Sequence, residues 1–427
     1  MEGRIPYDRI ADVLIESFDN FGLHGKVTKV VTDNGSNFVK AFGVLGQTEL
    51  AADGHMEDND ATTDSIDLTT ILNGASHGDV RVPLPPHHRC SAHTLNLVAT
   101  VDASKAESCE MSSRPLCSVL RTCRQLWNRQ GQSATAAETV QRFCGRALQR
   151  PVATRWNSLF DALTCLMELD NAGKDLDGLC RTLQIPPFQR PRDVLFIKEY
   201  CEVMKPVACA IDVVQRDDVY FGHLLPTITV LKKRLDHLRM TGLKYCTPLV
   251  EALLEGIRSR FDHLYDDRDL LLAAVVIPRF KERWIDDEPR RRDLIEVLSE
   301  EVRRPWYSSS NTEGRYSSSE ADKARPNQED IEDYFSFAVP VVEDSGNEVV
   351  SRYLSCSSHA SLSVLAGHPV IRKVFLTYNT ALPSSAAVER VFSVAADILT
   401  RKRGKMTDKN FEIQLLLKLN RCVILTH

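Results

Sequence analysis

The chain has 427 residues, more than one domain usually contains, and its 43% of hydrophobic residues exclude a mostly disordered chain. Fifty-three basic and fifty-eight acidic residues give a net charge of −5, which excludes a protein that binds polyanions over its whole surface. Twelve cysteines without the spacing of a disulfide scaffold, no secretory signal and no apolar run of about 18 residues indicate a reducing compartment and no membrane partner.

The amino-terminal segment predicts a helix, then a strand, then an acidic loop. Residues 7–21 carry apolar side chains at helical spacing, and residues 26–32 are a β-branched run typical of a buried strand. Asp33 follows this strand in an Asp-Asn-Gly turn, where a carboxylate can reach a cleft. Residues 46–80 contain eight acidic residues and no Lys or Arg, so we expect a solvated loop there.

An arginine-rich stretch follows the acidic loop. Residues 87–97 predict a strand or turn that enters a helix. Further helices are expected at residues 118–127, 136–148 and 159–169. Residues 111–156 contain eight arginines, Arg121 and Arg124 among them, and a single acidic residue. Two interpretations are open: these arginines contact the phosphates of a nucleic acid, or they lie on a solvated helical face.

The middle of the chain, from residue 171 to residue 304, is predicted to be helical almost throughout. Apolar stripes with the helical period lie at residues 194–215 and 224–240. A Ser-rich and acidic segment after them is typical of a flexible linker. Helices are predicted again at residues 386–399 and 408–425. We therefore expect four parts, which are residues 1–165, 166–304, 305–348 and 349–427.

Four motifs stand out along the chain. They are Val-Thr-Asp-Asn-Gly-Ser-Asn-Phe at 31–38, Arg-Cys-Ser-Ala-His-Thr-Leu-Asn-Leu at 89–97, Thr-Arg-Trp-Asn-Ser at 154–158 and Pro-Ser-Ser-Ala-Ala-Val-Glu-Arg-Val-Phe-Ser at 383–393. Their order and spacing resemble those of the hAT family of DNA transposases, which implies an RNase H-like catalytic fold split by a long helical insertion. The predicted fold class is therefore mixed α/β and mostly helical, with a truncated RNase H-like fold interrupted by a large all-α insertion.

The resemblance assigns two acidic residues to a catalytic site. Enzymes of this family hold two divalent metal ions, Mg²⁺ or Mn²⁺, with three carboxylates, and Asp33 and Glu389 match the second and third of them. The resemblance places the first on an earlier strand, and we expect neither that strand nor the zinc-finger module common in the family in this chain. We therefore expect weak metal binding and a catalytically incomplete site. Without the resemblance, Asp33 is a turn residue and Glu389 complements a helix dipole.

Two further motifs each have a structural and a functional interpretation. Cys90 and His93 form a C-x-x-H step that the resemblance places near the active site. A zinc site would need further ligands at a convincing spacing, and the alternative is a packed structural pair. The resemblance implies that Trp156 stacks on a displaced base while the neighbouring Arg155 binds a phosphate, and the alternative is a tryptophan in the core.

The last predicted helix is apolar on more than one face, which exceeds what a helix lying on a single core needs. We expect this surface to be buried against a second chain or against the insertion domain, and the resemblance implies dimerisation. The residues expected in the contact are Val391, Phe392, Leu416 and Leu419. The alternative is a central helix within one monomer.

These expectations favour a transposase-derived nuclear protein that forms a homodimer or higher oligomer and binds DNA, without complete catalytic machinery. One alternative is the C-terminal part of an active DNA transposase, whose cofactor would be Mg²⁺ or Mn²⁺. Another is a binding module co-opted for transcriptional regulation, which the sequence does not separate from the first interpretation.

Overall fold

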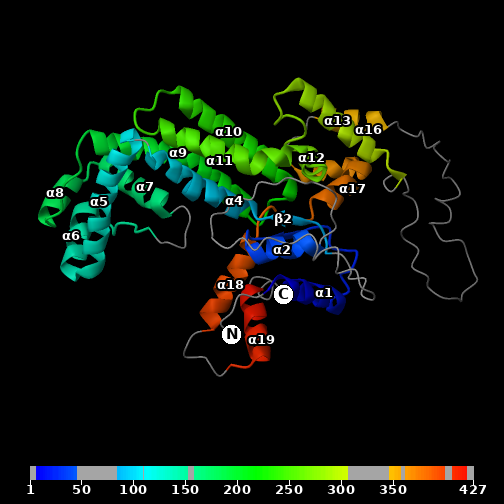
Figure 1. The fold of residues 1–427 in the computed structure, drawn as a ribbon, viewed down its shortest axis with the longest axis horizontal. Coiled ribbons are helices and arrows are strands. Elements are labelled where there is room, and N and C mark those ends of the chain that lie inside the picture. Colours follow the sequence, from blue (N-terminus) through cyan, green and yellow to red (C-terminus); the bar gives the residue numbers. More distant parts are fainter. Residues whose placement is uncertain are drawn as a thin grey trace, which may run out of the picture. The chain divides into compact units, whose positions relative to one another are not determined.

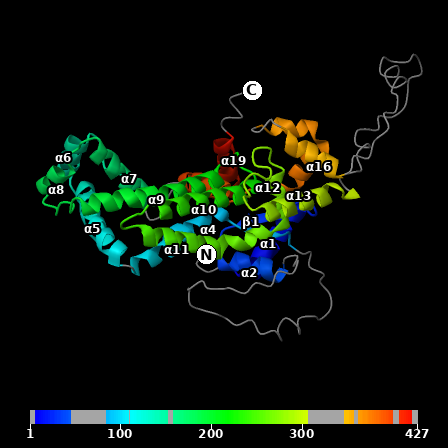
Figure 2. The ribbon, with the colours of Figure 1, turned by 90° about the horizontal axis from the view of Figure 1, so that it is seen from above.

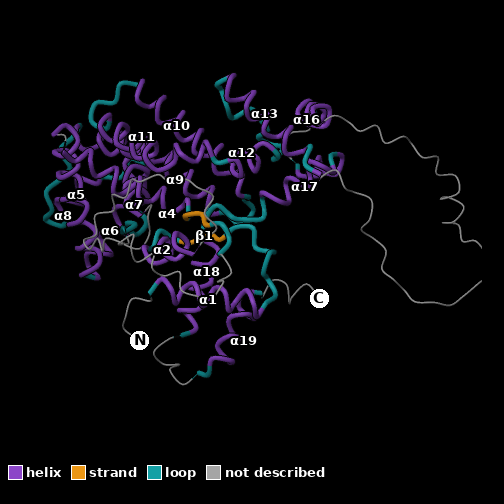
Figure 3. Tube along the Cα trace, turned by 45° about the vertical axis from the view of Figure 1, so that its right-hand side comes forward, coloured by secondary structure: helices purple, strands orange, loops and turns teal. Residues whose placement is uncertain are grey.

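The structure is a computed structural model that describes residues 6–45, 84–108, 110–151, 158–305, 346–356, 361–399 and 406–420. Most of these residues are helical, which confirms the mostly helical prediction, and the described strands form one two-stranded sheet (Figure 3). The predicted acidic loop lies outside the described residues, as do residues 306–345 of the predicted linker.

The chain forms two compact units. The first unit contains Met1–His93 and Ser384–His427, and the second contains Thr94–Pro383. The first unit is therefore built from two segments that are far apart in the sequence, and the whole second unit is inserted between them.

In the first unit, two helices pack together against a short parallel sheet. Its elements are α1 (Tyr7–Asn20), β1 (Val30–Thr32), α2 (Ser36–Leu45), β2 (His87–Arg89), α18 (Ala386–Ile398) and α19 (Asp408–Leu419). β1 and β2 run parallel, with Val30 opposite His87. Buried Ala11, Phe42 and Leu84 form the core, because α1 and α2 each direct an apolar stripe towards it.

The first strand is shorter and less buried than the sequence predicts. The β-branched run covers residues 26–32, but β1 contains only Val30–Thr32 and its side chains are half-buried. The reason is pairing, because β2 offers only three residues to the described ladder. A β-branched run gives the tendency to form a strand, whereas its length depends on the partner.

The second unit contains helices and their connections in the part of the chain described. Its longer helices are α5 (Glu110–Gln132), α6 (Ala134–Cys144), α7 (Ser158–Asn171), α9 (Arg192–Gln215), α10 (Leu224–Met240), α11 (Thr247–Phe261) and α13 (Glu288–Val302). Shorter ones are a π-helix (Val98–Asp102), α8 (Leu176–Thr182), α12 (Arg268–Val275), α16 (Gly346–Ser355) and α17 (Pro369–Tyr378), and α4 (Ser91–Leu97) begins in the first unit and ends in the second. In Figures 1 and 2, α9, α10 and α11 run side by side, with α5 to α8 at one end and α12, α13, α16 and α17 at the other. No helix among the described residues is long and apolar enough to cross a membrane.

Helix ends in the second unit depend on local chemistry. α6 ends at Cys144 rather than at residue 148, because Gly145 adopts a left-handed φ of 77° that stops the helix. α5 begins at Glu110, eight residues before the predicted start, although Pro115 lies inside it. The apolar spacing of the sequence is regular only after that proline, which is why the prediction is too short.

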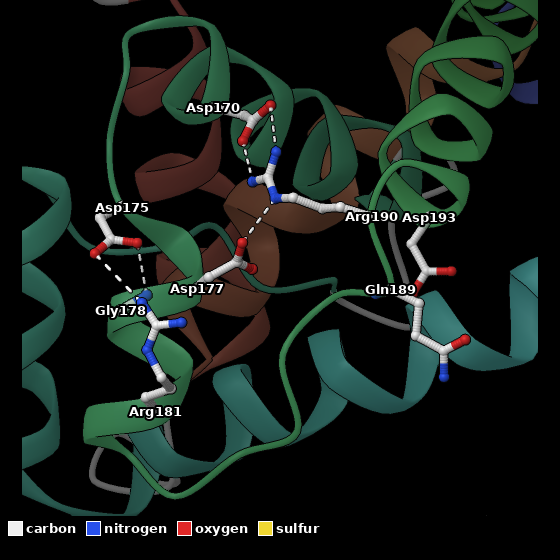
Figure 4. Close-up of polar contacts among 8 residues, drawn as sticks. All are labelled: Asp170, Asp175, Asp177, Gly178, Arg181, Gln189, Arg190 and Asp193. Atoms are coloured by element: carbon white, nitrogen blue, oxygen red, sulfur yellow. Dashed lines mark hydrogen bonds and ion pairs between the residues drawn. The ribbon is translucent and has the colours of Figure 1, made fainter.

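A polar cluster joins three segments near the start of α9 (Figure 4). Arg190, which precedes α9, forms ion pairs with Asp170 at the end of α7 and with Asp177 of α8, the latter at 2.8 Å. Asp175 caps α8 by accepting the N–H of Gly178 at 2.6 Å. Buried Asp193, in the first turn of α9, accepts the N–H of Gln189 at 2.9 Å. These contacts hold the short helix α8 against its longer neighbours.

Candidate functional site

The carboxyl ends of β1 and β2 lie at one edge of the sheet, since parallel strands end on the same side. Asp33 directly follows β1, and Cys90 directly follows β2. The N–H of Cys90 donates a hydrogen bond of 2.7 Å to the carbonyl oxygen of Thr32. The motif around Asp33 and the motif around Cys90 therefore meet at this edge.

Asp33 is exposed and organises the turn between β1 and α2. Its Oδ1 accepts the N–H of Gly35 at 3.2 Å, as an Asp in a turn commonly does. A Cβ at position 35 would lie 3.0 Å from the same oxygen, so glycine leaves room for this turn. Oδ2 of Asp33 has no hydrogen-bond partner among the described residues. The turn role is therefore real, and half of the carboxylate stays available to a ligand.

The thiol of Cys90 is a packing centre. Cys90 is fully buried, and its Sγ accepts the N–H of His93 at 3.4 Å and the N–H of Ser385 at 3.3 Å. It thus joins β2 to the start of α4 and to the start of α18. These contacts favour the structural interpretation of the Cys90–His93 pair, because the sulfur is occupied by backbone donors.

Glu389 lies in the first turn of α18 and is exposed. Its Oε1 accepts the hydroxyl of Ser385 at 3.0 Å. Ser385 is the N-cap residue of α18, but its side chain makes no capping bond to the backbone. Ser385 is a site residue that sequence reasoning missed. The serine four positions before a first-turn glutamate was the available signal.

A continuous set of contacts therefore links Thr32, Cys90, Ser385 and Glu389. It brings three of the four sequence motifs into one unit. It does not gather a metal-binding group, since no cluster of three or more His, Cys, Asp or Glu suited to a metal ion occurs among the described residues. Asp33 and Glu389 alone do not provide the carboxylates that a two-metal centre requires, and no zinc site forms around Cys90 and His93 in the described part.

His87 of β2 packs against residues at this edge of the sheet. Its Nε2 lies 2.8 Å from Oγ1 of Thr32, and its ring stacks on Phe42 with centroids 4.4 Å apart. Burial, aided by the charge of Arg89, lowers the pKa of His87 to about 4. The imidazole is therefore neutral at pH 7 and packs as an aromatic side chain. His88 is buried with Nε2 3.2 Å from Oγ of Ser91.

The residues expected to bind DNA are placed only in part. Arg121 and Arg124 are exposed on α5 of the second unit. Arg155 and Trp156 lie outside the described residues, so both interpretations of Trp156 stay open.

The expected dimerisation residues lie on two helices that pack together, α18 and α19. Phe392, Leu416 and Leu419 are exposed by 66%, 53% and 41%, and Val391 is half-buried. No side chain of α19 is buried. This exposure does not fit a central helix within the first unit, and the dimerisation contact stays a prediction.

No family model and no curated protein matches this sequence. The resemblance to hAT transposases therefore depends on the motifs and on their arrangement in the first unit.

Proposed function

We propose that the chain is a transposase-derived nuclear protein of the hAT type that binds DNA and self-associates. The observation that carries the proposal is the bridge formed by Cys90, whose backbone N–H binds Thr32 and whose thiol binds the N–H of Ser385. Three motifs that are far apart in the sequence meet there. Such convergence is expected of a site and not of motifs that match by chance.

The order of elements also supports the proposal. A helix, a strand, a helix and a parallel strand are followed, after a long insertion, by the helix that carries Glu389. This order is compatible with the later part of an RNase H-like fold, in which one carboxylate follows a strand and another lies on a later helix. In the proposed protein, Asp33 and Glu389 are remnants of a cleavage site, and the arginines of the second unit supply the attraction for DNA.

The test measures DNA binding and cleavage by the whole chain. We expect binding to a 30-base-pair duplex that weakens steeply with salt, because phosphate contacts release counterions. We also expect no Mg²⁺- or Mn²⁺-dependent cleavage above that of the Asp33→Asn plus Glu389→Gln variant. Absence of DNA binding at 50 mM salt would overturn the proposal.

The active transposase is the second candidate, and the exposure of both Asp33 and Glu389 favours it. It predicts metal-dependent cleavage that either single substitution removes. Cleavage of that kind would show that Asp33 and Glu389 form a working catalytic site and not a remnant. A transcriptional regulator is the third candidate, and it also predicts DNA binding. It differs from the active transposase because the Asp33→Asn plus Glu389→Gln variant would still regulate a reporter gene.

A further inference from the structure

Helix α5 of the second unit has two sharply different faces. Its buried side chains recur at intervals of three and four residues and pack against α6 and α9. They are Val119, Thr122, Cys123, Leu126 and Trp127. This packing fixes the rotation of the helix, so the opposite face points to solvent whatever its composition.

The solvent face of α5 is basic over residues 111–132, which include no Asp or Glu. Arg121, Arg124 and Arg129 are exposed on it. None of these three arginines forms an ion pair with a described residue. Some exposed arginines of the same unit are paired, for example Arg146 with Glu168 at 2.6 Å. A row of like charges costs free energy through mutual repulsion, so it suits a surface that meets an anionic partner.

A fourth guanidinium extends this row at the carboxyl end of α5. The side chain of Gln130 both donates to and accepts from the backbone of Leu148, at 3.0 and 2.8 Å, which holds the following segment beside the helix. Arg150 then lies over Gly131, where a Cβ would be only 2.3 Å from its Nη1. Because position 131 is a glycine, this exposed guanidinium has room to lie against the helix.

We propose that Arg121, Arg124, Arg129 and Arg150, the α5 surface, bind the sugar-phosphate backbone of a nucleic acid. The inference rests on the proposed function, because DNA is the partner tested. From Arg121 to Arg129 the helix rises about 12 Å, a length over which one strand of B-DNA presents about three phosphates. The guanidinium fork binds phosphate oxygens in pairs and keeps its charge at any physiological pH. Contacts of this kind carry affinity without base sequence preference.

The first experiment compares two triple variants of the whole chain. Arg121→Gln plus Arg124→Gln plus Arg129→Gln removes three charges from the α5 surface. Arg234→Gln plus Arg290→Gln plus Arg292→Gln removes three exposed arginines from α10 and α13. Fluorescence anisotropy with a labelled duplex, and with the corresponding single strand, gives Kd between 50 and 200 mM salt.

We expect the α5 variant to weaken duplex binding at least tenfold at 100 mM salt and to lower the salt slope by about 2.7, which is 0.9 for each lost phosphate contact. The control variant should change Kd less than threefold. Equal losses of DNA affinity in the two variants, or no loss in the α5 variant, would contradict the proposal that the α5 surface binds DNA. Displacement of the DNA by polyglutamate as effective as that by unlabelled DNA would also overturn it, in favour of an acidic protein partner.

The second experiment keeps the charge of Arg150 but changes the position of its guanidinium. Gly131→Ala displaces the Arg150 guanidinium from its place against the helix, while alanine favours the helix itself. We expect binding two- to fivefold weaker, similar to that of Arg150→Gln, with the thermal midpoint unchanged or higher. Wild-type affinity in both variants would remove Arg150 from the surface. A wild-type chain that binds no DNA defeats the proposed function, whereas one that binds with every α5 variant unimpaired defeats only this inference.

Discussion

Glu199 on α9 is a buried carboxylate with an unusual set of partners. Its two oxygens accept the backbone N–H groups of Lys244, Tyr245 and Cys246 at 2.9, 2.8 and 3.0 Å. These groups lead into α11, where backbone donors lack partners within the helix. Cys246 is the N-cap residue of α11, whereas Lys244 and Tyr245 belong to the turn before it. Glu199 therefore holds this turn, and its charge complements the positive end of the helix dipole.

Glu199→Gln is expected to destabilise the second unit by about 1–3 kcal/mol, because an amide nitrogen cannot accept and at least one of the three N–H donors loses its acceptor. Urea unfolding followed by circular dichroism measures this. Glu202→Gln is the control, because Glu202 is exposed on the same helix and its loss should cost less than about 0.5 kcal/mol. Equal stability of the two variants would contradict this role of Glu199.

At the scale of elements, the π-helix and α11 approach closely at one glycine. Gly256 of α11 faces Asp102, and a Cβ there would lie 2.6 Å from Oδ2 of that carboxylate. Asp102 is buried and pairs with Arg260 of α11 at 2.7 Å. The absent side chain at position 256 therefore lets the ion pair form between the two elements.

Gly256→Ala should lower the free energy of unfolding by about 1–3 kcal/mol, since overpacking outweighs the higher helix propensity of alanine. Gly43→Ala in α2 is the matched control, because nothing lies within 4 Å of a Cβ there, and it should be neutral or stabilising. The thermal unfolding midpoints of the two variants test this prediction. A Gly256→Ala protein as stable as the wild type would mean that the two elements separate without cost.

Sequence reasoning found elements better than it found contacts. The stripe at residues 224–240 gave α10 with its observed bounds, because helical periodicity is local information. The run at residues 26–32 gave a strand twice too long, because strand length depends on a partner. The bond between Cys90 and Ser385 joins residues 295 positions apart, so no local pattern could indicate it. Motif resemblance selected Asp33 and Glu389 as site residues but not Ser385, which lies in the same motif as Glu389.

At the scale of the whole molecule, the exposed apolar surface of α18 and α19 predicts self-association. A leucine buried between chains contributes about 1.5–3 kcal/mol, and Leu416 and Leu419 are half exposed in the single chain. Leu416→Asp plus Leu419→Asp should convert a dimer to monomer in sedimentation equilibrium, because unpaired carboxylates are costly in an interface. Helical circular dichroism should stay intact, since neither leucine supports the monomer core.

Asn410→Asp plus Gln414→Asp adds the same two charges to α19 at exposed polar positions, and its dimer should persist. A wild-type chain that stays monomeric at tens of micromolar would end the self-association proposal. Dissociation of both variants alike would show that charge, and not the leucine surface, governs the equilibrium.

The division of the first unit between the two ends of the chain has a consequence for synthesis on the ribosome. Residues 94–383 must be translated after α1, β1, α2 and β2 have emerged and before α18 exists. At ordinary elongation rates this takes roughly 15–60 s, long compared with the folding of most small domains. During that interval the thiol of Cys90 lacks the Ser385 donor that it has in the finished protein. The nascent first half of the unit is therefore incomplete during that interval, and the edge that carries Asp33 is completed only when the last helices leave the ribosome.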